Sequence, residues 1–377
     1  MHRNLPSPRT MTARADHSSD PMFWKNMDGG LSNAEFFWRD HYKFLEENGY
    51  RLRPRYSPDW EPSWRGTNRD RFLCEDGLPP IRVTTMQATR LSDGRIVVLK
   101  QIWTERTPTE QTITRVFWDE PNASDPGNHS NFVYDVLHSP IYKVAFFVMP
   151  YLMRVHAIRF ATVGEAMECF RQVFEGLSFI HRNHVAHRDI HLFNIMMDPA
   201  PLLSEVPHPV WKDRSYVEPE RKVKRCVRTN HPVRYYIIDF GLSTQFSPGE
   251  PHVAPIVIGG DKSVPEYKNA PGDCNPFHVD VYHLGNMIRE DFLQESRSLD
   301  FMQPLVDRMT RERPDDRPTI GEAMQQFEQL LGSLSQWKLR SRYVYRDENL
   351  GRPFRAVRHL YRTISYVLAG LPAIPVV

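Results

Sequence analysis

Two short polar motifs, one after a predicted helix and one after a predicted strand, leave few folds open to this 377-residue chain. The tripeptide HRD at residues 187–189 is followed by Asn194, and the tripeptide DFG stands at residues 239–241. A helix is predicted from Thr162 up to the first motif, because apolar residues recur there with helical spacing. Either tripeptide alone would be weak evidence, since short motifs often occur by chance. Together, in this order and after a predicted helix and a predicted strand, the two motifs are specific evidence for one kind of fold.

Further segments extend the pattern on both sides. Lys100 ends an apolar strand predicted over residues 95–100, which follows a strand over 86–91, and a helix is predicted over 108–118. C-terminal to the DFG motif, the chain contains VPE at 264–266, DVYHLG at 280–285 and RPDDRPT at 313–319. This set resembles the signature of the eukaryotic protein kinases. The resemblance covers residues 81–331, and we identify the chain as a divergent member that is similar to fungal protein-kinase-like proteins.

The resemblance implies an α+β, two-lobed fold with a small β-rich N-lobe and a larger helical C-lobe. It also implies a serine/threonine protein kinase that uses ATP and Mg²⁺ and acts on a protein substrate. Such chemistry depends on positioning and on cations, because the transition state of phosphoryl transfer spreads negative charge over the phosphate oxygens. The sequence does not identify the substrate.

The resemblance further assigns roles to residues around the nucleotide. Lys100 would hold the α- and β-phosphates, oriented by a carboxylate of the following helix. We choose Glu110 for this carboxylate, because Ile113 and Phe117 continue one apolar face from it; Glu105 and Glu120 are the alternatives.

The resemblance implies that adenine binds to the segment at the end of an apolar strand predicted over residues 142–149. Met149 would be the gatekeeper, and the Pro150 carbonyl and the Leu152 N–H would face the base. Proline is tolerated at position 150, because only the backbone carbonyl is needed there and not the N–H group that proline lacks.

The two motifs supply the remaining active-site positions. Arg188 and Asp189 belong to the catalytic loop, where Asp189 would accept the proton of the substrate hydroxyl. Asn194 and Asp239 would bind Mg²⁺ through oxygen, the ligand type that this ion prefers. Three positions are expected to be structural, namely Asp280 and the pair Glu266 and Arg317.

The chain departs from the family pattern at two places. No glycine-rich loop precedes Lys100, since residues 81–90 contain no glycine. That loop normally brings backbone N–H groups close to the phosphates. In addition, His191 stands where a lysine is usual, and Gly259 stands where a threonine of the substrate loop is usual. The first departure predicts weak nucleotide binding or a different lid, and the second predicts an altered acceptor site.

Two other functions remain open at this point. The spacing D-x-H-x-x-N over residues 189–194 also resembles small-molecule kinases of the aminoglycoside and choline type. The missing glycines are also compatible with a catalytically weak pseudokinase that acts as a scaffold. The C-terminal motifs favour a protein kinase over the first alternative, and the complete set of polar residues favours an enzyme over the second.

Composition shifts divide the chain into segments. Residues 1–30 are polar and predicted to be a disordered leader, and 31–80 are predicted to form a helix, opened by a capping box at Ser32 and Glu35, and an extended strap. The N-lobe would span 81–150 and the C-lobe 151–335. A Pro-rich insertion at 199–235, with a basic stretch at 220–225, is predicted to be a solvated surface loop.

Residues 336–377 are predicted to be a basic tail. The slightly longer segment 332–377 has eight basic and two acidic residues, a net charge of +6, and apolar residues at helical spacing from Val357 to Leu368. We expect this amphipathic helix to dock on the kinase domain, with peripheral membrane contact as the alternative.

Composition restricts the partners and the compartment. The formal net charge is only +2, which argues against nucleic acid as a partner, and no apolar run is long enough to predict a transmembrane segment. Only four widely spaced cysteines are present, in no CxxC pair, which is typical of a reducing compartment. We therefore expect a cytoplasmic protein, with nuclear localisation as the alternative.

Overall fold

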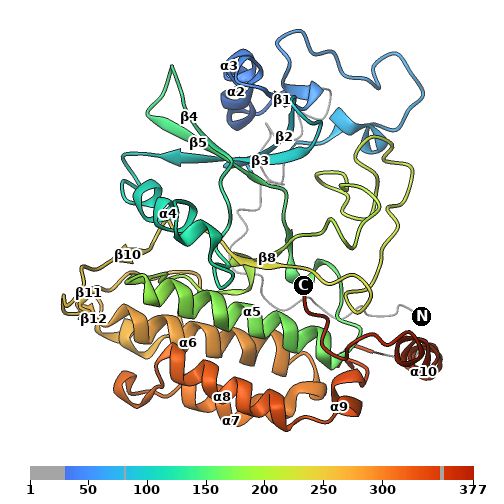
Figure 1. Cartoon of the computed structure of the whole chain (residues 1–377). Coiled ribbons are helices and arrows are strands. Elements are labelled where there is room, and N and C mark those ends of the chain that lie inside the picture. The colour runs from blue at the N-terminus through green and yellow to red at the C-terminus, as the bar shows by residue number, and fades with distance from the viewer. Residues whose placement is uncertain (1–29, 80–81, 349–351) are drawn as a thin grey trace, which may run out of the picture.

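In the computed structural model, which describes residues 30–79, 82–348 and 352–377, a five-stranded antiparallel sheet lies over a helical lobe (Figure 1). The sheet has the order β1-β2-β3-β5-β4. Its strands are β1 (Tyr50–Leu52), β2 (Thr85–Arg90), β3 (Ile96–Trp103), β4 (Asp135–His138) and β5 (Val144–Pro150). The predicted strands of this region are confirmed with small shifts at their ends. The predicted leader at 1–30 lies almost wholly outside the described residues.

The first strand of the sheet comes from the N-terminal segment. Residues 50–52 pair antiparallel with β2, so that Tyr50 lies opposite Arg90 and Leu52 opposite Ala88. Between β1 and β2, residues 53–79 and 82–84 belong to a long strap. The predicted capping box at Ser32 is present, and two helices follow it, α2 (Asn33–Asp40) and α3 (Tyr42–Glu47).

These two helices cover the outer face of the sheet. The side chains that share this small core are all buried, and include Trp38, Leu45, Leu52, Leu99 and Phe146. The helix predicted over 108–118 is α4 (Glu110–Trp118), which lies between the sheet and the helical lobe (Figure 1).

The helical lobe is built around α5 (Val163–Arg182), whose side chains are mostly buried. Thr162 caps this helix, as predicted, by accepting a hydrogen bond from the Glu165 N–H at 3.1 Å. The other helices of the lobe are α6 (Pro276–Ile288), α7 (Gln303–Met309), α8 (Ile320–Ser333), α9 (Gln336–Arg340) and α10 (Arg352–Leu368). Its short strands are β6 (Met153–Arg154), β7 (Val185–Ala186), β8 (Ile195–Met197), β9 (Tyr235–Ile237), β10 (Thr244–Gln245), β11 (Ala254–Pro255) and β12 (Asp273–Cys274).

The insertion at 199–235 is only partly the solvated loop that was predicted. Its basic stretch is exposed apart from Val223, but Leu202 and Ser215 are fully buried. Arg228 is 2% exposed and donates a hydrogen bond of 2.9 Å to the Val155 carbonyl. The Trp211 indole donates to the Phe72 carbonyl of the strap at 3.0 Å. The insertion is therefore an ordered wall that packs against both the C-lobe and the strap.

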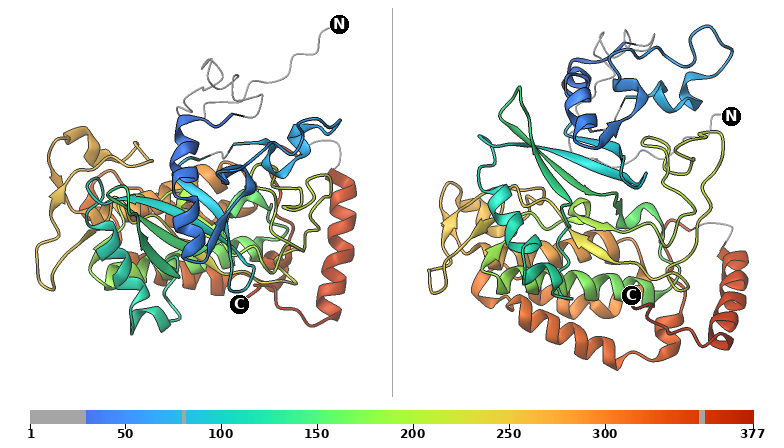
Figure 2. Two further views of the ribbon diagram at one scale, coloured as in Figure 1. Left: turned by 90° about the horizontal axis from the view of Figure 1, so that it is seen from above. Right: turned by 45° about the horizontal axis from the view of Figure 1, so that its top comes forward.

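The tail lies against the helical lobe through the polar side of its helix. The α10 helix lies at the margin of the lobe, apart from α5 to α8, in all three views (Figures 1 and 2). His359 and Thr363 face the body of the protein, whereas the large apolar residues of α10 are exposed. The apolar face of α10 therefore points away from the lobe. Among the described residues, no helix combines the length and hydrophobicity needed to cross a membrane.

Candidate active site

A cavity of about 490 Å³ lies in the cleft between the sheet and the helical lobe. The strands β2, β3 and β5, the helix α4 and the loops around β8 and β9 contribute to its walls. Seven of the predicted site residues line it, namely Lys100, Glu110, Met149, Pro150, Leu152, Asn194 and Asp239. Residues from three distant parts of the sequence thus meet in one cavity.

Lys100 connects the two lobes through its ammonium group. Its Nζ lies 2.5 Å from Oε1 of Glu110 and 2.8 Å from Oδ1 of Asp239. Burial alone would lower the pKa of Lys100, but the carboxylates of Asp239 and Glu110 outweigh burial and raise it. The structure places Glu110, and not the alternatives, against Lys100, because Glu105 pairs with Lys143 at 2.6 Å and Glu120 accepts from the Ser124 hydroxyl.

The backbone of the HRD motif is held by a buried carboxylate of α6. Asp280, which is fully buried, accepts hydrogen bonds from the backbone N–H groups of His187 at 2.7 Å and Arg188 at 2.6 Å. His181 lies 2.9 Å from the same carboxylate. These contacts stabilise Arg188 with φ at +69°, a conformation that residues other than glycine rarely adopt. The Arg188 guanidinium does not line the cavity but donates to the Pro255 carbonyl.

Asp189 is hydrogen-bonded to Asn194, which lines the cavity, and has three polar neighbours. Its carboxylate accepts hydrogen bonds from Asn194 Nδ2 at 3.0 Å and from the Gly260 N–H at 2.7 Å, and His191 Nε2 lies 3.4 Å away. Burial raises the pKa of Asp189, but His191 and the Gly260 N–H outweigh burial and hold it below its usual value. The carboxylate is therefore ionised at neutral pH and can accept a hydrogen bond from an incoming hydroxyl.

The two departures noted at His191 and Gly259 both lie next to Asp189. A Cβ atom at Gly259 would lie 2.4 Å from Oδ1 of Asp189, and one at Gly260 would lie 2.3 Å from Cδ2 of His191. Real Cβ atoms are essentially never this close to another atom. The histidine ring and the Gly-Gly segment thus fit each other, and the loop approaches Asp189 because it has no side chains there.

Phe240 of the DFG motif is packed into the core. Its ring is 1% exposed and its centroid lies 4.9 Å from that of Phe117 in α4 and 5.1 Å from that of His187. Asp239, which precedes it, has φ at +74° and is turned toward the cavity and Lys100. The packing of Phe240 against α4 is therefore coupled to the ion pair between α4 and β3.

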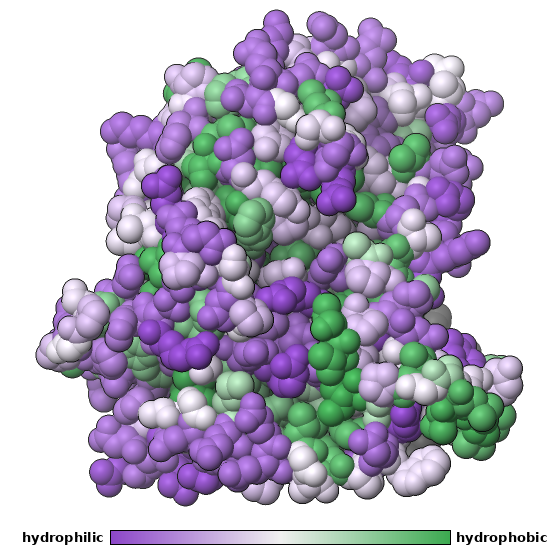
Figure 3. All heavy atoms as spheres, viewed as in Figure 1, coloured by the Kyte–Doolittle hydropathy of each residue, from purple (hydrophilic) through white to green (hydrophobic). Residues whose placement is uncertain are grey.

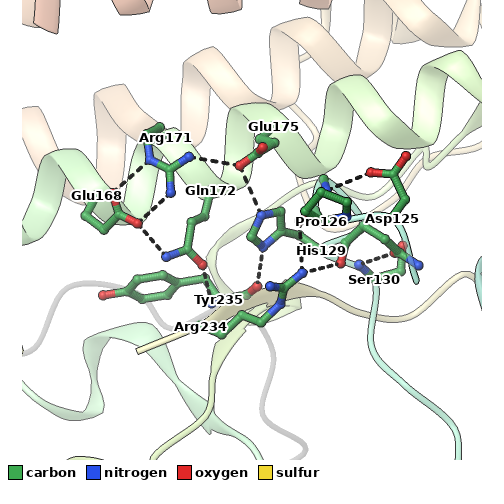
Figure 4. A network of polar contacts seen from close by, with 12 residues as sticks. Asp125, Pro126, His129, Ser130, Glu168, Arg171, Gln172, Glu175, Arg234 and Tyr235 are labelled. Carbon is green, nitrogen blue, oxygen red and sulfur yellow. Dashed lines mark hydrogen bonds and ion pairs between the residues drawn. The ribbon is translucent and has the colours of Figure 1, made fainter. Parts of the chain in front are cut away.

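A polar network holds the strand that leads to Asp239 (Figure 4). Gln172 of α5 accepts from the Tyr235 N–H at 2.8 Å and donates to Glu168 at 2.8 Å. Nδ1 of the His129 ring lies 3.0 Å from the Tyr235 carbonyl, and Nε2 lies 3.3 Å from Glu175 (Figure 4). The network ties β9 to α5 and none of these residues lines the cavity, so it positions Asp239 without entering the site.

The oxygen donors present suit a magnesium ion that a nucleotide brings. Asn194 directs its Nδ2 group to Asp189, which leaves its Oδ1 atom for another partner, and Asp239 lines the same cavity. Within the described ranges, no cluster of three or more His, Cys, Asp or Glu side chains could hold a metal alone. Magnesium usually binds one or two carboxylates together with substrate phosphates, so this donor set fits it.

The cavity has a wall that the sequence did not reveal. Arg53 and Arg82 of the strap and Lys212 of the insertion line it on the side of Leu152. Arg53 is paired with Glu75 at 2.6 Å. Burial, reinforced by Arg154 and Arg53, lowers the pKa of Lys212 to about 8. No local pattern marks these residues, because their position depends on how two long loops pack.

The expected structural pair is present in the helical lobe. Arg317 binds Glu266 through two hydrogen bonds of 2.7 Å, and both side chains are buried. Arg317 also donates to the carbonyls of Arg311 at 2.8 Å and His278 at 3.0 Å. The pair fixes the end of the segment that carries Gly259 and Gly260 to the start of α8.

Comparison with known proteins agrees with this geometry. The protein kinase domain family matches residues 83–290. The chain is also similar to the serine/threonine-protein kinase oca2 of Schizosaccharomyces pombe, with 28% identity over 122 residues. That match covers 29% of this chain but only 18% of the relative. The family match spans more than half of the chain and includes both motifs and every residue that lines the cavity except Arg53 and Arg82, and the chain therefore belongs to the protein kinase domain family.

Proposed function

We propose that this protein transfers the γ-phosphate of ATP to a serine or threonine hydroxyl of a protein, and that it requires Mg²⁺. The observation that carries the proposal is the meeting of Lys100, Glu110 and Asp239 in one cavity, which Asn194 also lines while it donates a hydrogen bond to Asp189. The matched relative is a serine/threonine kinase, which supports this choice of acceptor.

Each residue of the cavity would act on a different part of the reactants. Adenine would lie against Met149, where the Pro150 carbonyl accepts and the Leu152 N–H donates a hydrogen bond. The Lys100 ammonium would contact the α- and β-phosphates. Asp239 and Asn194 would hold the Mg²⁺ ion, which when bound neutralises charge on the phosphate oxygens.

Asp189 would orient the acceptor hydroxyl for in-line attack. Its low pKa makes it a weak base, so its main contribution would be a hydrogen bond that aligns the hydroxyl oxygen with the γ-phosphorus. The proton would pass to this carboxylate or to the phosphate as the new O–P bond forms and the bond to the β-phosphate oxygen breaks.

The strap would replace the glycine-rich loop as the lid over the nucleotide. It joins β1 to β2 at the same end of the sheet where Arg82, Thr84 and Thr85 line the cavity. Among the interactions found for the described residues, Arg82 has no carboxylate partner, so its guanidinium would be available to a phosphate group. The Arg82 guanidinium would thus bind phosphate in place of some of the backbone N–H groups that the glycine-rich loop supplies in the family.

The experiment compares two variants for nucleotide binding and for phosphate transfer. Asp239→Ala should weaken Mg-ATP binding and turnover together. Asp189→Asn should leave Mg-ATP affinity unchanged and reduce turnover by ~10²–10⁴, the usual effect of losing a group that handles the proton. Isothermal calorimetry gives affinity, and labelled ATP with mixed protein substrates and with small amino-alcohols gives transfer.

Three outcomes would contradict the proposal. Transfer only to the amino-alcohols would indicate a small-molecule kinase. No thermal shift of the parent protein at millimolar Mg-ATP would indicate a scaffold. Transfer by Asp189→Asn at the parent rate would show that Asp189 does not handle the acceptor.

A further inference from the structure

The α10 helix is held on the protein at both ends. Ahead of it, Arg342 binds Glu348 at 2.6 Å, and residue 342 pairs with Thr162 at the start of α5. Behind it, the Leu371 carbonyl accepts a hydrogen bond of 2.6 Å from Arg340. Ala373 is 5% exposed, and its carbonyl lies where a Cβ atom of Gly164 would be, so α5 approaches it closely. The orientation of α10 is therefore set by the fold.

This orientation turns the apolar face of the helix outward. His359 contacts the Arg340 carbonyl at 3.0 Å, and Thr363, one turn further, is 9% exposed. The opposite face carries large apolar residues at helical spacing that are 47–83% exposed, namely Phe354, Val357, Leu360, Tyr361, Ile364, Val367 and Leu368. Hydrophobic surface gathers over this helix at the lower right of the space-filling view (Figure 3).

The charge of the same helix is entirely positive. It contains four arginines and no aspartate or glutamate. With 100° between successive residues, Arg355, Arg358 and Arg362 lie side by side along one border of the apolar face. Arg355 lies 3.7 Å from Glu348, which Arg342 also engages at 2.6 Å. A ligand for this face must therefore be apolar where it contacts the apolar side chains and anionic where it contacts the arginines along their border.

We propose that α10 lies flat on an anionic lipid surface. An apolar face bordered by arginines matches a bilayer, where acyl chains lie beside negatively charged headgroups, and where long basic side chains reach back to those headgroups. A contiguous apolar patch of this size is unusual on a soluble protein that has no partner for it. The proposal is independent of catalysis, because the helix shares no residue with the cavity.

The test is co-sedimentation of the full chain with lipid vesicles at low salt. The protein should bind vesicles that contain phosphatidylserine and should bind pure phosphatidylcholine vesicles much more weakly. The double variant Leu360→Asp, Ile364→Asp places two charges in the apolar face and should abolish binding. Replacing Arg358 by Gln should weaken binding about fivefold, since one basic residue near an anionic surface is worth ~1 kcal/mol.

A matched control introduces the same two negative charges at other positions on the surface. Val217 and Val253 are 77% and 58% exposed and lie in the insertion and between β10 and β11, so Val217→Asp, Val253→Asp should bind anionic vesicles like the parent. Circular dichroism confirms that each variant is folded. Failure of the parent to bind, or equal binding by the α10 variant, would overturn the proposal. A concentration-dependent dimer that only the α10 variant disrupts, without vesicle binding, would assign the face to a second copy.

Discussion

Adding one methyl group at Gly260 should impair catalysis without affecting the fold. In Gly260→Ala, the new Cβ atom would lie 2.3 Å from Cδ2 and 2.6 Å from Nε2 of His191. Ordinary van der Waals contact begins at about 3.4 Å, so the ring or the loop must move by roughly 1 Å. The ring is the softer partner, because it is the end of a side chain, and its movement changes the 3.4 Å contact with Asp189.

The size of the effect follows from that displacement. A misplacement of ~1 Å near reacting groups can reduce turnover by about 10²-fold, or about 3 kcal/mol in the activation free energy. Stability should change little, because Gly260 is exposed and does not have a positive φ angle. Mg-ATP affinity should also be unchanged, since neither Gly260 nor His191 lines the nucleotide cavity.

Steady-state transfer of labelled phosphate, together with calorimetry for Mg-ATP, measures both quantities. Gly321→Ala is the matched control, because no atom lies within 4 Å of its added Cβ and it should keep full activity. Adding Gly260→Ala to His191→Ala should cost nothing further, since the ring that obstructs the methyl group is gone. Parent-like turnover of Gly260→Ala, or full additivity in the double variant, would refute the reasoning.

Three other perturbations have defined outcomes. Arg317→Ala should lower the free energy of unfolding by ~3–5 kcal/mol in urea titration, because Glu266 stays buried without its partner, whereas Arg313→Ala, whose side chain is 78% exposed, should not. Arg82→Ala should weaken Mg-ATP binding in calorimetry; unchanged affinity would show that the strap does not contact phosphate. Burial raises the pKa of Asp291 to about 6, so the native state binds a proton more tightly than the unfolded state, and stability should fall as pH rises from about 4 to 6. In thermal melts, Asp291→Asn should not lose stability over this pH range. A pH profile identical to that of the parent would contradict the assignment of this loss to Asp291.

The positions of the active-site residues could be predicted because the information is local. Lys100, Asp189, Asn194 and Asp239 belong to short motifs, and each motif is next to a helix or strand with a clear apolar period. The choice of Glu110 depended on helical spacing from Ile113 and Phe117, which α4 preserves. The structure brings all of these residues together as expected, while their catalytic roles stay predictions.

The missed features all depend on contacts between distant segments. Strand β1 has three residues and pairs with residues 36–40 positions later in the chain, so no local pattern identifies it. The insertion contains no regular helix or named strand in the described structure, and its buried residues follow from docking against the strap and α5. For α10, helical spacing predicted an apolar face, but only the anchors at Thr162 and Ala373 determine that this face points away from the protein.

The strand contributed by the N-terminal segment sets a practical limit on how this domain can be excised. The family match begins at residue 83, after β1 and the strap. A fragment cut there would leave β2 as an uncovered edge and would expose Leu99 and Phe146, which α2 and α3 now cover. The same fragment would end at residue 290 and would lose Arg317, leaving Glu266 buried without a counter-ion. The unit that folds alone should therefore extend at least from α2 through α8, and shorter expression fragments should aggregate.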